Sequence, residues 1–503
     1  RLTGYRPDTG RFRDFGPADP DEFYYYVKCG ADGTVAGLVK MARPHVVALD
    51  PDSGALRPVG PVADTQSQTG HVDLVKAADG RLYISSHAGA FRLEGATAIP
   101  VPAVPAAPPP PSLADGSTFK FLDGRADNVW LTRYRTVEIK RPDGTRRILE
   151  LDYEADGTPI YIVRAGTDGK VYGSSILPLH FFSYDPPSGA LIHHGACCTP
   201  SGEVYSMDCL GDKLYLASYT HAILSEFDLK RPFNWGGPIP GKPGEFKMGQ
   251  GDENLAYTYG PDDNPRQLGR LDTISFRPRD MVAGPAGKVW VVSIPDYGMW
   301  GGVLSWYDPA TGRFGGRHQH ILENCSPISI THLAGPDLLA MGFSIYGGSG
   351  TIPKAAKAGF ALWDPKTDTR VWTGDLGLDV LGVMDIEDAG DGLVYAIVHC
   401  LPEEVLVTEL MLLDLANEKI VGRYPLSERH GWPLEVSFLR DERYLYGLTR
   451  ETVYRVPRGT LDVEELWRDP RDGPGPMIGA GALIDGVYYF GSGARFRSIR
   501  VRP

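Results

Sequence analysis

The stretch DGRLYISS (79–86) joins a two-residue Asp-Gly turn to a short run of mainly apolar residues, and similar stretches recur along the chain. A tight Asp-Gly turn followed by such a run is typical of the second strand of a β-hairpin. Ten such units can be counted, beginning at residues 32, 79, 127, 168, 211, 286, 336, 391, 442 and 485.

A second turn follows many of these units. It has the form Asp-Pro-x-Ser/Thr-Gly, as in LDPDSG (49–54), YDPPSG (184–189) and YDPATG (307–312). Proline after aspartate and a closing glycine form a tight turn, so this turn marks a second hairpin. Four short strands repeating every roughly 41–56 residues are the blade of a β-propeller. We therefore predict an all-β protein, with residues 1–503 forming a single propeller of about ten four-stranded blades, or seven or eight as the fallback.

The two ends of the chain look like complementary halves of one blade. GYRPDTGRF (4–12) has the signature of a third strand and its turn, with no earlier strands before it. The last unit, 486–500, stops before such a turn. We predict that the terminal strands share one sheet and close the ring, which would leave no free sheet edge.

Composition excludes several classes of partner. The formal net charge is -12, whereas binding to nucleic acid needs clustered Lys and Arg, so no nucleic-acid partner is expected. No apolar run is long enough to span a membrane. The chain begins with Arg1, which leaves a removed leader or a trimmed end as alternatives; we expect a secreted or periplasmic protein. The sequence leaves the oligomeric state open.

Candidate site residues come from one set of connections. Loops between second and third strands, and the starts of innermost strands, should open on one rim of a propeller, where ligand sites form. These positions, or residues near them, hold cations, imidazoles and aromatic rings that we select as site candidates: His71, His87, Tyr219, His221, Arg266, Arg277, Arg279, Tyr297, Trp300 and Tyr346. Any single histidine there could instead only satisfy loop backbone groups.

Two further segments carry specific expectations. The Gly- and Pro-rich segment 231–269 interrupts the repeat, and long irregular loops are usually functional, so we predict a wall over the candidate rim. HHGACC (193–198), with Cys209 and His221, could hold Zn, although its spacing matches no standard finger; buried free thiols are the alternative. The cofactor is left open, with a divalent metal ion as the candidate.

The repeats, together with His, Tyr and Arg on blade loops, resemble the propeller-fold carbohydrate lyases, which include ulvan, oligogalacturonate and rhamnose–glucuronate lyases. The resemblance lies in blade style and site composition, and it implies β-elimination from a uronic-acid-containing glycan. Chosen by position, His71 and His87 would be base or acid, with Tyr219 and His221 as partners. Arg266, Arg277 or Arg279 would hold the carboxylate, and Tyr297, Trp300 and Tyr346 would form the sugar platform.

Two other functions fit the same residues. The chain could be a non-catalytic propeller that binds a glycan or a protein, or a glycoside hydrolase acting on the same rim. It has no Gly-x-Ser-x-Gly elbow, phosphate-binding loop, dinucleotide fingerprint or His-Glu-x-x-His motif, so these catalytic classes are not indicated.

Overall fold

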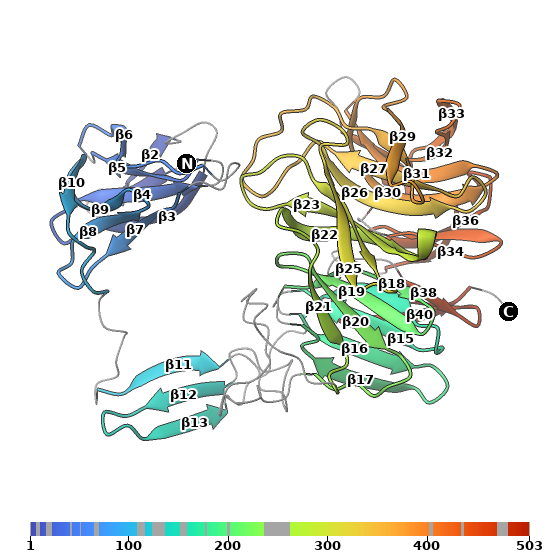
Figure 1. The fold of residues 1–503 in the computed structure, drawn as a ribbon, viewed down its shortest axis with the longest axis horizontal. Coiled ribbons are helices and arrows are strands. Elements are labelled where there is room, and N and C mark those ends of the chain that lie inside the picture. Colours follow the sequence, from blue (N-terminus) through green and yellow to red (C-terminus); the bar gives the residue numbers. More distant parts are fainter. Residues whose placement is uncertain are drawn as a thin grey trace. The chain divides into compact units, whose positions relative to one another are not determined.

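The computed structural model is almost entirely β-structure (Figure 1). Its forty described strands are accompanied by one five-residue helix, α1 (Leu426–His430), and one short 3-10 turn, η1 (Pro285–Gly287). The described residues are 2–6, 11–16, 23–40, 43–50, 52–64, 70–107, 116–122, 136–150, 158–176, 179–198, 202–235, 262–401, 406–433, 437–469 and 481–501.

The chain divides into two compact units. We call them the N-terminal unit (Arg1–Thr118 with Asp296–Trp300 and Tyr346–Lys354) and the propeller unit (Phe119–Pro295, Gly301–Ile345 and Ala355–Pro503). The expectation of a single ring over 1–503 is therefore corrected to two units. The all-β propeller class itself is confirmed.

The N-terminal unit contains two four-stranded antiparallel sheets, whose facing side chains form one apolar core that includes Leu38, Val46, Leu74 and Ile84. The first sheet is β3 (Phe23–Cys29), β4 (Val35–Lys40), β5 (His45–Leu49) and β6 (Leu56–Val59). The second is β7 (Val72–Lys76), β8 (Leu82–Ser86), β9 (Gly89–Glu94) and β10 (Thr97–Val101). A separate hairpin is formed by β1 (Leu2–Arg6) and β2 (Arg11–Gly16).

The propeller unit contains seven blades, each running from an innermost to an outermost strand, and the pairing of Ser344 with Gly382 joins the fourth and fifth blades into one eight-stranded sheet. The first three are β14 (Ile160–Ala165), β15 (Val171–Ser175), β16 (Phe181–Asp185) and β17 (Ala190–Gly195); β18 (Val204–Leu210), β19 (Lys213–Ser218), β20 (Ile223–Asp228) and β21 (Arg266–Arg270); and β22 (Ser275–Ala283), β23 (Val289–Pro295), β24 (Val303–Asp308) and β25 (Arg313–Gln319).

The other four are β26 (Ser326–Leu333), β27 (Leu338–Ser344), β28 (Phe360–Asp364) and β29 (Thr369–Gly374); β30 (Val380–Gly390), β31 (Leu393–Cys400), β32 (Val407–Asp414) and β33 (Lys419–Tyr424); β34 (Leu439–Arg440), β35 (Tyr444–Leu448), β36 (Thr452–Pro457) and β37 (Glu464–Arg468); and β38 (Ala482–Ile484), β39 (Val487–Ser492) and β40 (Arg495–Arg500). A separate three-stranded sheet is β11 (Thr118–Leu122), β12 (Thr136–Lys140) and β13 (Arg146–Glu150).

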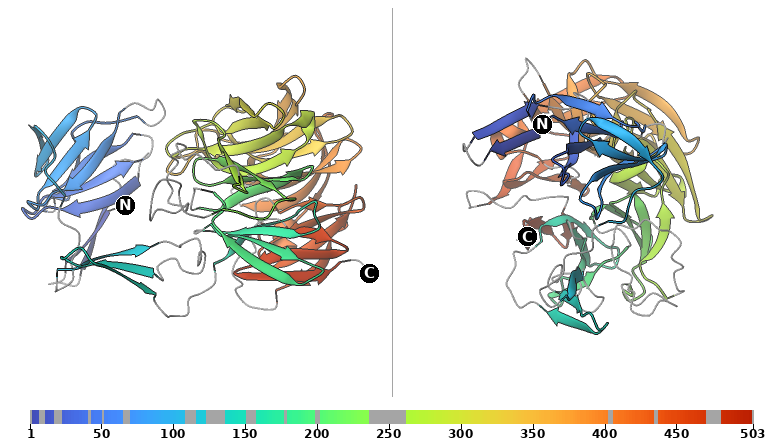
Figure 2. Two further views of the ribbon diagram at one scale, coloured as in Figure 1. Left: turned by 60° about the horizontal axis from the view of Figure 1, so that its bottom comes forward. Right: turned by 90° about the vertical axis from the view of Figure 1, so that its left-hand side faces the viewer.

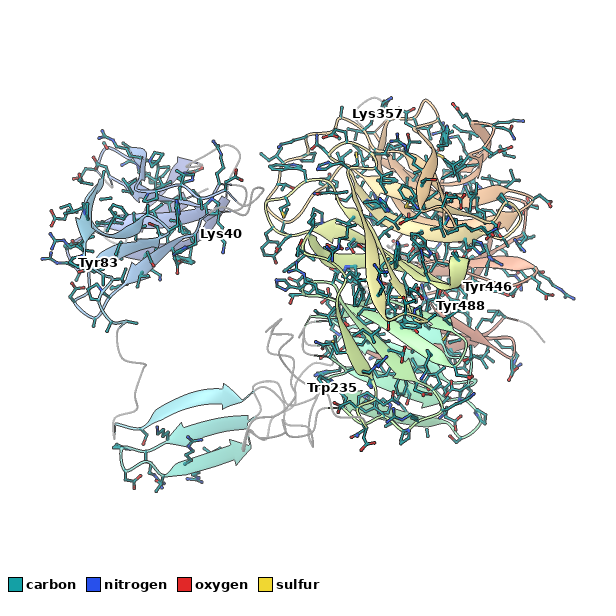
Figure 3. The ribbon with its side chains drawn as sticks, viewed as in Figure 1. Lys40, Tyr83, Trp235, Lys357, Tyr446 and Tyr488 are labelled. Atoms are coloured by element: carbon teal, nitrogen blue, oxygen red, sulfur yellow. The ribbon has the colours of Figure 1, made fainter. Side chains whose placement is uncertain are left out.

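The seven sheets close into a ring because each packs its face on the next. Apolar clusters join successive blades, and Tyr446 and Tyr488, labelled in Figure 3, stack between the last two with ring centroids 5.7 Å apart. The final sheet then packs on β14, where the Ile160 amide donates to the Gly493 carbonyl (2.9 Å). Figure 2 shows this junction of the green and red sheets.

Two sequence predictions about the ring are therefore corrected. The ring holds seven blades, which was the fallback, and its closure comes from sheet-on-sheet packing. Residues 4–6 and 11–12 lie in the β1–β2 hairpin, whereas 487–492 and 495–500 lie in the three-stranded sheet β38–β40. Nine of the ten counted units fall on second strands, two in the N-terminal unit and seven in the ring; the unit at 127 lies outside the described residues.

The repeated turns form as their residues predict. In YDPATG, the Asp308 carboxylate accepts hydrogen bonds from the Ala310 amide (2.9 Å) and the Thr311 hydroxyl (2.8 Å). Gly312 closes this turn between β24 and β25 with φ 68°, a region that favours glycine. The second strands are buried on both faces, as in β15 and β19, because every blade is covered by a neighbour on each side.

Aspartates on the innermost strands link one blade to the next. Asp208 accepts from the Ala283 amide (2.7 Å), Asp280 from the Ile330 amide (2.8 Å), and Asp385 from the Phe438 amide (2.6 Å). Burial raises the pKa of Asp208 to about 6 and that of Asp385 to about 7. These hydrogen bonds connect the innermost strands of neighbouring blades around the ring axis.

Candidate functional site

Each blade has two ends with different connections. In the second blade the tight turn Gly211–Asp212 lies at one end, which we call the turn rim. At the other end, which we call the loop rim, Val204 at the start of β18 pairs with Ser218 at the end of β19. Starts of innermost strands and loops after second strands therefore share the loop rim, as the sequence predicted.

The loop rim holds Tyr219 against the start of β18. The Tyr219 amide donates to the Glu203 carbonyl (2.9 Å), and the Gly202 amide donates to the Tyr219 carbonyl (3.2 Å). A Cβ atom at position 202 would lie 2.1 Å from Cδ1 of Tyr219 and 2.6 Å from its carbonyl oxygen. Gly202 is therefore needed for this close approach.

Two arginines of β22 lie on the tyrosines of the neighbouring blade. Arg277 and Arg279 are two residues apart, and each guanidinium carbon lies over a ring: Arg277 over Tyr219 and Arg279 over Tyr205, both 5.0 Å from the centroid. Arg277 also lies 5.6 Å from the Phe276 ring. Planar guanidinium groups stack favourably on aromatic faces, so both cations are held in defined positions.

Behind these cations is a buried carboxyl group. Glu203 is only 3% exposed, accepts a hydrogen bond from Tyr205, and faces Arg279 and Arg277. Tyr161 of β14 donates to Tyr205, and the two rings meet edge to face with centroids 5.0 Å apart. We call Tyr161, Glu203, Tyr205, Tyr219, Arg277 and Arg279 the rim cluster.

Burial dominates the protonation of this cluster. Loss of water around Glu203 raises its pKa to about 7, although Tyr205 and the two arginines oppose that shift. Burial likewise raises the pKa of Tyr205 and, more strongly, that of Tyr161, so both phenols keep their protons at neutral pH. The cluster thus combines fixed positive charge with a carboxyl group that changes charge near neutrality.

His221 is next to the rim cluster. Its ring meets that of Phe276 with centroids 4.6 Å apart, and Phe276 in turn contacts Tyr219 at 5.3 Å. The backbone of His221 has φ 64° and that of Ala222 has φ 49°, an unusual region for non-glycine residues. The turn after β19 therefore presents Tyr219 and His221 on either side of one buried aromatic ring.

Arg266 does not join this cluster. It lies on the outermost strand β21, opposite Glu226 in register, and its guanidinium pairs with the Glu226 carboxylate at 3.5 Å. Glu226 pairs with Tyr215 across β19 and β20, at the half of the blade nearer the turn rim. Arg266 is one of the three arginines predicted as alternatives for the carboxylate clamp, and it lies away from the other two because β21 starts at the turn rim.

The segment 231–269 also starts from the turn rim. Its stem follows β20, and the Leu229 amide just before it donates to the Asp212 carbonyl (3.0 Å). The side-chain Nδ2 of Asn264 donates to the carbonyls of Arg231 and Pro232 (3.1 Å each), which ties the two ends of the stem together. The expectation of a wall beside Tyr219 and His221 is thus corrected for the stem; residues 236–261 lie outside the described residues.

The two aromatic loops predicted as a sugar platform pair with each other. They join β23 to β24 and β27 to β28, and the Trp300 indole donates to the Ile352 carbonyl (2.8 Å). The Lys354 ammonium lies 3.5 Å from the centroid of the Trp300 ring, so this face is already covered by a cation. Tyr346 is 54% exposed, and Tyr297 lies in the same pair of loops.

His71 and His87 form a pair in the N-terminal unit. The His87 amide donates to the His71 carbonyl (3.0 Å), and the two ring centroids are 6.4 Å apart. They share one rim of their own sheet, as predicted. Their convergence with Tyr219 and His221 stays a prediction.

The Cys/His segment is part of the core of the first blade. A hydrogen bond of 2.8 Å joins Nε2 of His194 to the Ser183 hydroxyl, and the His194 ring stacks on Phe233. Burial lowers the pKa of His194 to about 4. Cys197 and Cys198 are buried in the same cluster. Within the described part of the chain no three His, Cys, Asp or Glu side chains gather as metal ligands.

Sequence reasoning missed Glu203, Tyr205 and Tyr161. SGEVYSMDC (201–209) places Glu203 directly before β18, the innermost strand of its blade. A search of every innermost-strand start, rather than of cations and histidines alone, would have found it.

Comparisons with known proteins give likeness of fold only. No protein-family model and no curated protein matches the chain. The extracellular domain of a hybrid two-component system, BT4673 of B. thetaiotaomicron, is 10% identical with a TM-score of 0.42, covering 99% of this chain and 61% of that one. PorZ, a surface component of the type-IX secretion system of Porphyromonas gingivalis, is 11% identical with a TM-score of 0.42, covering 95% and 62%.

A third similar structure is virginiamycin B lyase from Staphylococcus aureus with quinupristin. It is 11% identical with a TM-score of 0.45, covering 69% of this chain and 96% of that one. The chain therefore spans about three fifths of the length of the first and second of these proteins. Among its described residues, none of the helices is long and apolar enough to cross a membrane.

Proposed function

We propose that the rim cluster binds the carboxylate of an acidic sugar and that the protein is a lyase that cleaves uronic-acid-containing glycans by β-elimination. The observation that carries this proposal is the pair Arg277 and Tyr219, a fixed cation stacked on a phenol at the loop rim, with His221 beside them. Arg277 would receive the carboxylate, because a guanidinium matches it with two parallel hydrogen bonds.

The chemistry needs one base, one acid and one positive charge. When the base removes the proton on the carbon next to the carboxylate, the electron pair forms a carbon–carbon double bond. The bond to the glycosidic oxygen then breaks, and the acid protonates that oxygen. Tyr219 and His221 are the two groups placed to exchange these protons, and Arg277 stabilises the negative charge that develops on the carboxylate.

Tyr219→Phe tests this assignment. The substitution removes only the hydroxyl and leaves the ring under Arg277, so turnover on uronate polysaccharides should fall by about 10²–10⁴. Ultraviolet absorbance of the unsaturated product measures the reaction. Binding without any product in the unmodified protein would instead support a glycan-binding propeller, and a saturated product with incorporated water would support a hydrolase.

The roles of His71 and His87 stay predictions within the same proposal. His87→Ala should lower turnover by about 10²–10⁴ if His87 supplies the base or acid. Unchanged turnover would confine the reaction to the propeller unit. A secreted or periplasmic location and a carbohydrate partner likewise stay predictions.

A further inference from the structure

Glu203 is a buried carboxyl group that faces the two rim arginines, Arg277 and Arg279. It is nine-tenths or more buried, and its Oε2 atom has no hydrogen-bond partner among the described residues. The charged and titratable groups that face it are Arg277 and Arg279 from β22, Tyr205 from β18, and Tyr161 from β14. Its ionised form therefore balances part of the positive charge to which an acidic ligand would bind.

A ligand carboxylate at Arg277 would compete with Glu203 for that positive charge. Two carboxylates beside the same arginines repel each other strongly where water is excluded, and one of them then holds a proton. A sugar carboxylate is the stronger acid, with an ordinary pKa near that of an α-carboxyl, about 3.5. Burial raises the pKa of Glu203 to about 7, so Glu203 is the group that accepts the proton.

We propose that Glu203 takes up a proton when the rim cluster binds an acidic sugar, so that the charge of the ligand replaces the charge of Glu203. This inference rests on the proposed function, because it takes the ligand carboxylate to sit at Arg277. It makes Glu203 a residue that sets the ligand's required charge and the pH range of binding.

Linkage fixes the direction of the pH effect. A ligand that makes Glu203 bind a proton more tightly must itself bind more tightly when Glu203 is protonated. Affinity for an acidic sugar should therefore be highest below the pKa of Glu203. Above it, affinity should fall by up to about tenfold per pH unit.

Calorimetric titration of the full chain with a trisaccharide of galacturonic acid tests the inference. At pH 8, runs in buffers with different ionisation enthalpies count the protons taken up per bound ligand. The unmodified protein should take up most of one proton, and Glu203→Gln should lose that uptake and bind about tenfold more tightly at this pH. His221 is the imidazole beside the rim cluster, and any uptake that persists in Glu203→Gln is assigned to it.

Glu226→Gln is the matched control, since Glu226 also faces an arginine and a tyrosine of the second blade but lies away from the loop rim. It should retain the uptake of the unmodified protein. Equal uptake in the unmodified protein and Glu203→Gln would overturn the inference while leaving the proposed function intact. Absence of binding to the unmodified protein would overturn the proposed function and this inference with it. If Glu203→Gln fails to fold, affinity of the unmodified protein that does not change between pH 6 and pH 9 overturns the inference alone.

Discussion

Two clusters in the propeller unit contain the same three kinds of side chain but differ in their access to water. Glu203, Tyr205 and Arg279 lie at the loop rim, and Arg279 is only 7% exposed. Tyr215, Glu226 and Arg266 lie on β19, β20 and β21 of the second blade; the Tyr215 hydroxyl donates to Glu226 (3.0 Å), and the Arg266 side chain is 57% exposed.

The difference shows that residue type alone does not make a site. At Glu226, water and the Lys213 ammonium, 3.9 Å away, both stabilise the negative charge of the carboxylate. An exposed ion pair of this kind contributes little to stability. At Glu203 water is excluded, which favours the protonated, uncharged form of the carboxyl group. Without water, the charges of the neighbouring arginines are also less screened. The first three residues belong to the rim cluster. We call Glu226, Tyr215, Arg266 and Lys213 the outer cluster.

Removal of one arginine from each cluster should separate them most clearly. Arg277→Ala should lower turnover on uronate polysaccharides by about 10²–10³, the scale of losing one group that stabilises developing negative charge. Arg266→Ala should leave turnover unchanged. Steady-state formation of the unsaturated product measures both variants, and an equal loss in the two would remove the functional distinction between the clusters.

Replacement of each glutamate should reveal different pH dependences of stability. The pKa of Glu203 rises from the ordinary 4.5 to about 7 on folding, so its neutral form is favoured in the folded state. The unmodified protein therefore loses stability as the pH rises from about 4.5 through 7, and Glu203→Gln avoids that loss. The gain of Glu203→Gln should be absent near pH 4 and reach roughly 3 kcal/mol at pH 8.

Chemical denaturation at several pH values measures that gain. Glu226→Gln should change stability by at most about 1 kcal/mol over the same range, because its two cationic partners, Arg266 and Lys213, are accessible to water. Parallel pH curves for the unmodified protein and Glu203→Gln would show that Glu203 is ionised in the folded state as readily as in solution.

Removal of the tyrosine hydroxyls should change stability less than replacement of Glu203, and the rim cluster should again lose more than the outer cluster. Tyr205→Phe takes the hydrogen-bond donor from a buried carboxyl group and should destabilise the fold by about 1–3 kcal/mol at pH 8. Tyr215→Phe should cost less, about 0.5–1.5 kcal/mol, since Glu226 keeps Arg266, Lys213 and water as partners. Denaturation midpoints give both values, and the reverse order would contradict the difference in burial.

The smallest expected difference concerns the shape of the cation. Arg279→Lys keeps the charge but loses the planar group that stacks on Tyr205, which should cost about 0.5–2 kcal/mol. Arg266→Lys should be neutral within about 0.5 kcal/mol, because an exposed ion pair tolerates either cation. Thermal unfolding of the two variants compares them, and equal shifts would show that stacking on Tyr205 adds nothing.

Much of the architecture could be predicted because its signals are local. The turn Gly211–Asp212 and the strand after it depend on a few adjacent residues, and this pattern marks nine described second strands. Placement of Tyr219, Arg277 and Arg279 on one rim also followed from strand direction alone. The separation of Arg266 from these residues could not be predicted, because its position in the blade depends on how the 231–269 segment returns to β21.

The sequence by itself determined the all-β repeat, the blade boundaries and the rim that carries Tyr219 and Arg277, because turn chemistry and strand direction act over a few residues. Only the tertiary structure decided that seven sheets close the ring, since closure depends on the packing of β38–β40 against β14 across hundreds of residues. It also decided that Glu203 is buried beside Arg277 and Arg279, whereas Glu226 pairs with an exposed arginine. Both are glutamates beside a tyrosine and an arginine, and only the packing of neighbouring blades removes water from one of them.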